Sequence, residues 1–491
     1  MKPLPNPERN VAIDRVPKCF ASPEGIPMTP PFVISALCVM IAFCAVGAAS
    51  SGKVKSANAY EMASRRAGPL SVTGIVMGAL VAGGSTIGTV QMAYLYGLSG
   101  WWFTLGSGIG CLVLGLWFAR PVRRSGLVTL PQFIEGRYGA PTALLTLVGS
   151  SLGTLLSIIA QFIAGVALLQ SVFPVSQAVA TTALSVMILA FIFTGGLKSF
   201  SVVGNAKTLL LYLLLILCTA KTVSLGFSPE AFAGDLATRP WFGVFERGVG
   251  VDVGACVSLL IGVLCTQIYM QAVFAARDEG AARTGCLVAS VLIPPLGLMG
   301  VWIGSAMRAS GVVVDAAQAL PVFLNAHFSP VVAGALWAGL AITVVGGAAG
   351  LTLGVATNLS RDLYMKIPGV NRSDGRVLRI SRGAVVLVVV VSAFAGLAMR
   401  GGLILQLSYV GMGLRGAGMF VPLVMAIFRP GCLTPRWAFL LSSCGLGSML
   451  LAPLILPGVE PLFVGLAVSA LCLVPAVAFG KQYRPGNGKS G

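Results

Sequence analysis

Charged and metal-binding side chains are scarce in this chain. Histidine occurs once, charged residues make up 10% of the sequence, and there are 15 acids against 33 lysines and arginines. Intramembrane hydrolysis or metal-dependent chemistry needs a nucleophile with its base, a carboxylate pair or a cluster of ligands. Every acid except Asp252 falls outside the long hydrophobic runs, and Asp252 lies at the end of one. We therefore expect no enzyme, no metal and no organic cofactor.

The cysteines exclude a redox or zinc framework. All 11 stand singly, without a Cys-x-x-C pair. Single cysteines inside apolar runs are small packing residues, and we interpret these in that way.

Long hydrophobic runs make up most of the chain. Hydrophobic residues make up 56% of the chain and the mean hydropathy is +0.90. We predict an all-α integral membrane protein with about thirteen transmembrane helices, since each run can cross a hydrocarbon core about 30 Å thick. The runs lie near 32–51, 70–96, 101–119, 142–172, 176–194, 204–225, 248–272, 284–306, 330–356, 383–399, 402–428, 437–457 and 461–480. Residues 32–480 then form a single transmembrane domain.

The net charge of +18 comes mainly from lysines and arginines in the loops between hydrophobic runs. This distribution does not form a nucleic-acid-binding patch. If the N-terminus is outside and the spans alternate, the inner loops collect most lysines and arginines. The outer loops between spans hold only Arg239, Arg247, Arg308 and Arg400. This is the positive-inside pattern. It predicts a multi-pass protein of the inner (plasma) membrane with a cytoplasmic C-terminus and no nucleic-acid partner; we also expect a monomer.

The two ends of the chain are polar. We expect residues 1–31 to be disordered and residues 481–491 to form a cytoplasmic tail. The first run ends in AVGAAS, which resembles a signal-peptidase site, but a lead of this length favours a true helix. Met28 is an alternative start of the chain.

Glycines interrupt the second run. Gly78, Gly83, Gly84 and Gly88 weaken a helix interior by roughly 1 kcal/mol each. They favour a broken helix whose free carbonyls and amides bind ligands, with the polar side chains of Ser85, Thr86 and Gln91 at the same depth. The alternative is that the glycines only allow another helix to pack closely.

The seventh run carries a similar pattern. It contains Gly248, Gly250, Gly254 and Gly262, followed by Thr266 and Gln267. A second break here would make runs two to six and seven to eleven two halves of an inverted repeat.

Six segments along the chain, in order, resemble the motifs of the sodium:solute symporter family. They are Ala63–Leu70 (ASRRAGPL), Gly83–Ser99, Thr129–Gly139 (TLPQFIEGRYG), Gly195–Lys198 (GGLK), Thr266–Asp278 (TQIYMQAVFAARD) and Ser360–Tyr364 (SRDLY). The resemblance implies the LeuT-like fold, an inverted five-plus-five repeat with one extra N-terminal and two extra C-terminal helices. It also implies alternating-access transport of a small polar solute, such as an organic acid or amino acid, usually driven by sodium.

The chain departs from this family at the sodium site. The resemblance implies two hydroxyl residues on the ninth run, and counting back from SRDLY puts them at Gly346 and Gly347. Counting forward from Ala341 puts them at Val344 and Val345 instead. Neither alignment supplies a side-chain oxygen, which sodium as a hard cation requires.

A second departure lies on the sixth run. Gly204 stands where the family has an aspartate on the sodium exit path, and Lys207 follows one helical turn later. In relatives that are not sodium-driven, a lysine amine can fill the cation site, and Lys207 is the candidate here. The alternative is that Lys207 only extends its amine to the cytoplasmic interface.

Other polar residues within the runs are candidate solute ligands. Arg415 is costly in lipid and is a candidate anchor for an anionic solute, although structural pairing with a helix end is the alternative. Gln161, Gln267 and Gln406 lie on runs that line the cavity in the family.

The resulting hypothesis is a secondary transporter with a degenerate sodium site, either proton-coupled or uncoupled. One alternative is a conventional sodium-coupled symporter. Another is a transporter-like solute sensor, which the short tail disfavours because it has no room for an output domain.

Overall fold

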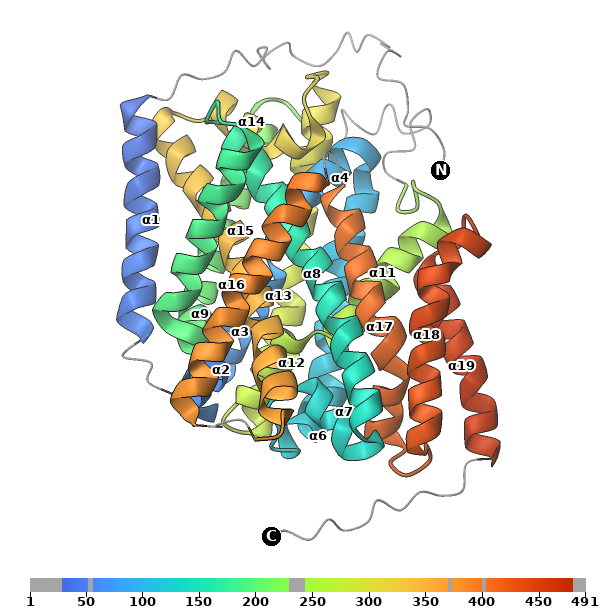
Figure 1. The fold of residues 1–491 in the computed structure, drawn as a ribbon. Helices are drawn as coiled ribbons and strands as arrows, with labels where there is room; N and C mark the ends of the chain where they lie inside the picture. The colour runs from blue at the N-terminus through green and yellow to red at the C-terminus, as the bar shows by residue number, and fades with distance from the viewer. Residues whose placement is uncertain (1–28, 52–55, 229–242, 370–372, 400–402, 480–491) are drawn as a thin grey trace.

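The protein is a bundle of long helices. The computed structural model describes residues 29–51, 56–228, 243–369, 373–399 and 403–479. Most of the predicted disordered segment 1–31 and the whole tail 481–491 lie outside these residues. Helix α1 (Pro30–Ser51) begins at the upper end of the bundle in Figure 1, and α19 (Pro461–Phe479) ends at the lower end.

The first half of the chain contains several short helices and two long ones, α8 and α9. They are α2 (Ala57–Met62), α3 (Pro69–Leu80), α4 (Thr89–Tyr96), α5 (Trp102–Val113), α6 (Ala119–Arg124), α7 (Leu130–Tyr138), α8 (Ala140–Gln170) and α9 (Gln177–Ser224). Two expected spans, 176–194 and 204–225, are joined in α9. Gly196 divides them with a φ of 59°, a backbone conformation that glycine adopts readily.

The second half contains α11 (Val249–Leu264), α12 (Gln267–Ala275), α13 (Glu279–Ala309), α14 (Ala319–His327), α15 (Pro330–Asn358), α16 (Asp374–Ala398), α17 (Ile404–Phe428) and α18 (Pro435–Ile455). In the described part of the chain, ten helices are long and apolar enough to cross a bilayer, or eleven if α11 and α12 form one bent span. The count of about thirteen stays a prediction.

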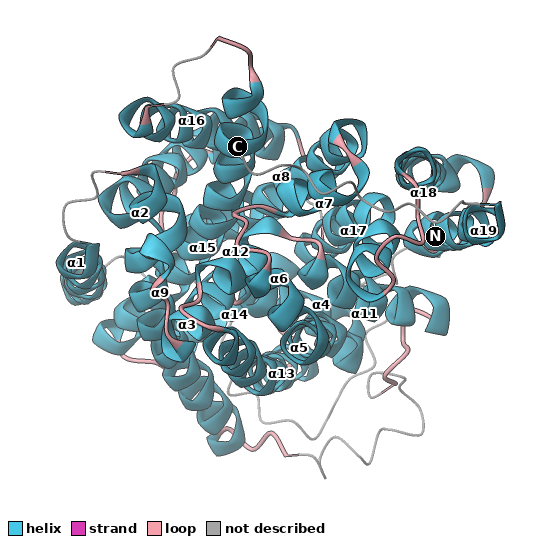
Figure 2. Cartoon of the chain, turned by 90° about the horizontal axis from the view of Figure 1, so that it is seen from below, coloured by secondary structure: helices cyan, strands magenta, loops and turns pink. Residues whose placement is uncertain are grey.

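The arrangement places the interrupted helices inside the bundle. Seen from below, α12 lies near the middle with α8, α15 and α6 around it, while α1 lies at one edge and α18 and α19 at the opposite edge (Figure 2). The peripheral helices carry many exposed apolar side chains, as lipid-facing helices do. The buried polar groups are therefore concentrated among the central helices.

Both expected helix breaks are present. In the second run, α3 ends at Leu80, and a π-helical turn (Gly84–Gly88) leads into α4. In the seventh run, α11 and α12 meet at a bend of 41°.

The second break lies later than the glycines predicted. Residues Gly250, Gly254 and Gly262 are inside the continuous helix α11, and the break is at Cys265 and Thr266. At Gly262 a Cβ atom would lie 2.5 Å from Cβ of Met412, so this glycine serves close packing against α17.

Candidate functional site

Polar side chains cap the break in the second run. The Ser85 hydroxyl accepts a hydrogen bond from the Ala82 amide at 2.8 Å, and the Thr86 hydroxyl donates to the Ala82 carbonyl at 2.9 Å. Gln161 of α8 accepts from the Gly83 amide through its Oε1 atom at 2.8 Å. Three of the predicted solute ligands therefore hold the unwound backbone in this conformation.

Lys207 of α9 reaches the same break. Its side chain is 1% exposed, and its Nζ atom donates to the carbonyls of Gly78 at 2.5 Å and Val81 at 2.8 Å. A third contact joins Nζ to the Thr343 carbonyl of α15 at 3.3 Å. The three N–H donors of an ammonium thus face three carbonyl oxygens. Lys207 does not extend to the interface.

Of the two hydroxyl positions counted from SRDLY, one faces this ammonium. A Cβ atom on Gly346 would lie 3.2 Å from Lys207 Nζ. A Cβ atom on Gly347 would lie 2.1 Å from the Cβ atom of Ala82, at the break itself. Positions 346 and 347 therefore border the break from α15. The other alignment gives Val344 and Val345, which are buried and apolar.

Close helix packing occupies the position of the missing aspartate. A Cβ atom on Gly204 would lie 2.1 Å from the Gly74 carbonyl of α3. Gly74 is equally restricted, since its Cβ atom would lie 2.2 Å from the Ser201 carbonyl of α9. Helices α3 and α9 approach each other at this pair, and no side chain fits between them.

Arg415 of α17 lies at the second break. It is 1% exposed, and one guanidinium nitrogen donates to the Thr266 hydroxyl at 2.6 Å. The other donates to the Gly153 carbonyl of α8 at 2.8 Å and to the Ser157 hydroxyl. Each break thus has one buried cation beside it, Lys207 at the first and Arg415 at the second.

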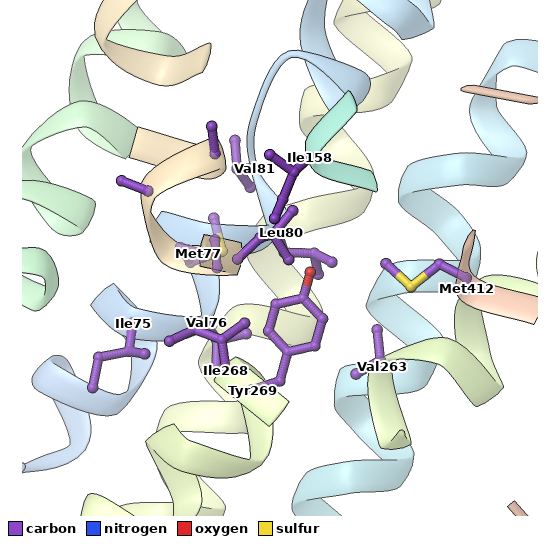
Figure 3. Packing of buried hydrophobic residues seen from close by; sticks show 14 of the residues in the cluster. Ile75, Val76, Met77, Leu80, Val81, Ile158, Val263, Ile268, Tyr269 and Met412 are labelled. Carbon is purple, nitrogen blue, oxygen red and sulfur yellow. The ribbon is translucent and has the colours of Figure 1, made fainter. Parts of the chain in front are cut away.

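Apolar side chains pack between the two breaks. Figure 3 shows Tyr269 of α12 standing between Leu80 of α3 and Met412 of α17, with Ile158 of α8 above it. All four side chains belong to the buried core. The region around Tyr269 is therefore filled by buried side chains from α3, α8 and α17.

The remaining predicted ligands lie farther apart. Gln91 of α4 accepts from the Ile404 amide at 3.1 Å and lines a cavity of about 190 Å³ that also contacts Phe162 and Asp315. Gln267 bonds the backbone of Val128 and Leu130, next to α7. Gln406 is exposed in the first turn of α17. Gln91 thus contacts the turn of α17 that carries the exposed Gln406, whereas Gln267 binds a different segment.

A polar cluster at the lower end was not predicted as functional. The buried Glu61 carboxylate of α2 accepts from the Ser360 hydroxyl at 2.8 Å and from Arg361 at 2.5 Å. Gln271 of α12 donates to the Glu61 carbonyl and to the Thr357 hydroxyl. Burial raises the pKa of the Glu61 carboxyl, and Arg361 opposes that shift. Ser360 and Arg361 belong to the SRDLY motif. That motif was the one feature of the sequence that could have indicated this cluster.

A model of the sodium:solute symporter family matches residues 60–434, which is most of the chain. The chain belongs to the sodium:solute symporter family. This membership confirms the predicted resemblance and makes the protein a transporter rather than an enzyme.

Solved structures show the same fold for this symporter-family chain. A sodium-coupled sialic acid symporter in a substrate-bound outward-open state aligns with a TM-score of 0.80 at 14% identity, covering 93% of this chain and 99% of that one. A nucleobase-cation-symport-1 family transporter, closed around bromovinylhydantoin, aligns with a TM-score of 0.58 at 13% identity, covering 87% and 95%. The predicted all-helical, LeuT-like fold is confirmed.

Proposed function

We propose that this symporter-family protein moves a small polar solute across the inner membrane by alternating access, without using the family's sodium site. The observation that carries the proposal is the Lys207 ammonium, which contacts the carbonyls of Gly78, Val81 and Thr343. In this account the lysine supplies, as part of the chain, the positive charge that the family obtains from a bound ion. The LeuT-like fold supports alternating access.

The residues present do not fit a sodium ion. Sodium needs about five or six oxygen ligands, and the carbonyls at the break already accept hydrogen bonds from Nζ. Gly346 and Gly347 offer no side-chain oxygen. Thr343 has one hydroxyl, which donates to the Gly339 carbonyl at 2.7 Å and keeps its own lone pairs. Because Nζ engages the carbonyls of Gly78 and Val81, we infer that sodium as a co-transported ion lacks a complete ligand shell at this position.

Lys207 also ties together three helices. Its bonds join α9 to the end of α3 and to α15. If the Lys207 ammonium lost a proton, a lone pair on Nζ would face one of the three carbonyls. The hydrogen bonds that join α9 to α3 and α15 would then be weaker. A titrating Lys207 would thus couple solute movement to protons, whereas a permanently charged one would give uncoupled or exchange transport.

Uptake into proteoliposomes tests this proposal. A solute is first found by screening organic acids, amino acids and sugars for thermal stabilisation of the purified protein. Its uptake should persist when choline replaces sodium, and Lys207→Ala should abolish uptake or its pH dependence. Lys221→Ala, on the same helix but near its end, is the control and should behave as wild type.

Three results would contradict the proposal in different ways. Saturable stimulation by sodium, together with wild-type behaviour of Lys207→Ala, would return the protein to a conventional sodium-coupled symporter. Solute binding without flux would favour the sensor. If uptake by Lys207→Ala kept the pH dependence of the wild type, Lys207 would not be the group that couples uptake to protons.

A further inference from the structure

We propose that the solute carries a carboxylate or a similar small anionic group, which binds between the Arg415 guanidinium and the N-terminus of α12. This inference rests on the proposed transport function, because it names the substrate class of the same site. It draws on two independent features, a buried cation without a counter-ion and an uncapped helix N-terminus beside it.

Arg415 has only neutral partners among the described residues. Its guanidinium contacts a backbone carbonyl, two hydroxyls and the Met412 sulfur, and none of the described ion pairs includes it. Its Nε atom is buried and has no hydrogen-bond partner in that part of the chain. An arginine without a counter-charge is costly at the centre of a membrane helix. An anion would offset that cost.

The N-terminus of α12 adds donors at the same place. The first amides of a helix have no intrahelical partner, and the helix dipole makes this end attractive to anions. Thr266 precedes α12 without capping it, because its hydroxyl donates to the Gly262 carbonyl at 2.5 Å. The same hydroxyl accepts from Arg415. The guanidinium and the nine-residue helix therefore adjoin at one side chain.

The charges around the two breaks select the class of solute. Lys207 and Arg415 are both 1% exposed, and the described ion pairs leave both without a carboxylate. A neutral sugar would leave both charges uncompensated. An amino acid would bring in a further ammonium. A carboxylate without an amine fits best, and an arginine fork can hold it through two parallel hydrogen bonds.

Matched carboxylates and amides test the inference. The purified wild-type protein is mixed with propionate, lactate or succinate, or with propionamide, lactamide or succinamide, and thermal stabilisation is measured. At least one carboxylate should stabilise the protein and its amide should not. Arg415→Gln should raise the apparent Kd of that carboxylate about ten- to a hundredfold. Arg415→Lys should restore part of the affinity, and Lys221→Gln should change nothing.

The outcomes separate the anion site from transport. Equal stabilisation by amide and carboxylate, or stabilisation only by neutral solutes, would overturn the anion site. If Arg415→Gln fails to fold, the anion site is tested by comparing carboxylates with amides on the wild type and by the carboxylate affinity of Arg415→Lys. Carboxylate binding without uptake into proteoliposomes would leave the anion site standing and contradict the transport function. Uptake of neutral solutes alone would support the transport function and contradict the anion site.

Discussion

At the residue scale, Lys207 and Gly346 form a complementary pair. The nearest atoms to a Cβ on Gly346 all belong to the Lys207 side chain. A serine at position 346 would be tight against the Lys207 ammonium, and shortening the lysine would relieve that contact. In Lys207→Ala/Gly346→Ser, a hydroxyl would join the freed carbonyls of Gly78 and Val81 as an oxygen ligand.

We therefore predict that Lys207→Ala/Gly346→Ser makes solute uptake respond to sodium. Uptake by this double variant should rise with sodium and saturate, while either single variant stays unresponsive. The measurement is uptake at increasing sodium with choline balancing the ionic strength. Equal responses of all three variants and the wild type would show that the pair does not define the cation position.

Gly204 gives a second prediction at this scale. Gly204→Ala places a methyl group 2.1 Å from the Gly74 carbonyl, so α9 and α3 must separate. Overpacking of this kind costs about 1–3 kcal/mol, and the Tm of the purified protein should fall. Gly383→Ala is the matched control, since nothing lies within 4 Å of its Cβ position. A Tm unchanged by Gly204→Ala would mean that the two helices are not in contact there.

The sequence singled out Lys207 because it lies one turn after Gly204, but it left open whether the amine extends to the interface. The structure buries the side chain, which no local pattern had decided. Gln267 could not be placed from a local pattern either. Its partners, Val128 and Leu130, lie far away in the chain, and only the tertiary fold brings them to its amide.

At the element scale, a short strained segment joins α2 to α3. Ala63, Ser64 and Arg65 have φ values of 45°, 54° and 55°, a left-handed conformation that costs about 1–2 kcal/mol per residue outside glycine. Contacts at both sides hold this segment. Glu61 is bound by Ser360 and Arg361, and the Ala67 amide donates to the Ala275 carbonyl at 3.1 Å.

Weakening these contacts should open the lower end of the bundle. Glu61→Gln removes the charge that Arg361 binds, and release of the strained segment favours separation of α2 from the turn Leu359–Leu363 that follows α15. Maleimide labelling of the buried Cys265, resolved by peptide mass spectrometry, should accelerate about tenfold or more, a shift of about 1.4 kcal/mol. Glu279→Gln, which breaks an exposed ion pair with Arg124, should leave the rate unchanged. Identical rates in both variants would exclude a gating role for Glu61.

The positions of the helix breaks show what patterns can and cannot predict. Glycines indicated the first break within a few residues, because the chain unwinds directly before Gly84. In α11, Gly254 and Gly262 accommodate neighbours instead, while nothing lies within 4 Å of a Cβ on Gly250. A Cβ on Gly254 would lie 2.6 Å from Glu460, which belongs to the segment before α19. A packing glycine and a breaking glycine look alike until the neighbour is known.

At the scale of the whole molecule, the LeuT-like fold was predictable because motifs along most of the chain agree with one family. Orientation remains a prediction. Helix α1 begins at the upper end and α19 ends at the lower end, so the two termini should lie on opposite sides of the membrane. The positive-inside rule then places the lower end in the cytoplasm.

Reporter fusions check this orientation. A C-terminal green fluorescent protein should fluoresce and a C-terminal alkaline phosphatase should be inactive. A tag at the N-terminus should be accessible to an impermeant protease in spheroplasts. Protection of that tag, with the C-terminal results unchanged, would contradict an outer N-terminus.

The central claim is that the Lys207 ammonium occupies the position that a sodium ion holds in the family. Binding of radioactive sodium to the purified wild-type protein, with choline as the background cation, tests it most directly. We predict no saturable binding in the wild type and its appearance in Lys207→Ala/Gly346→Ser. Saturable binding by the wild type that persists unchanged in Lys207→Ala would contradict the claim.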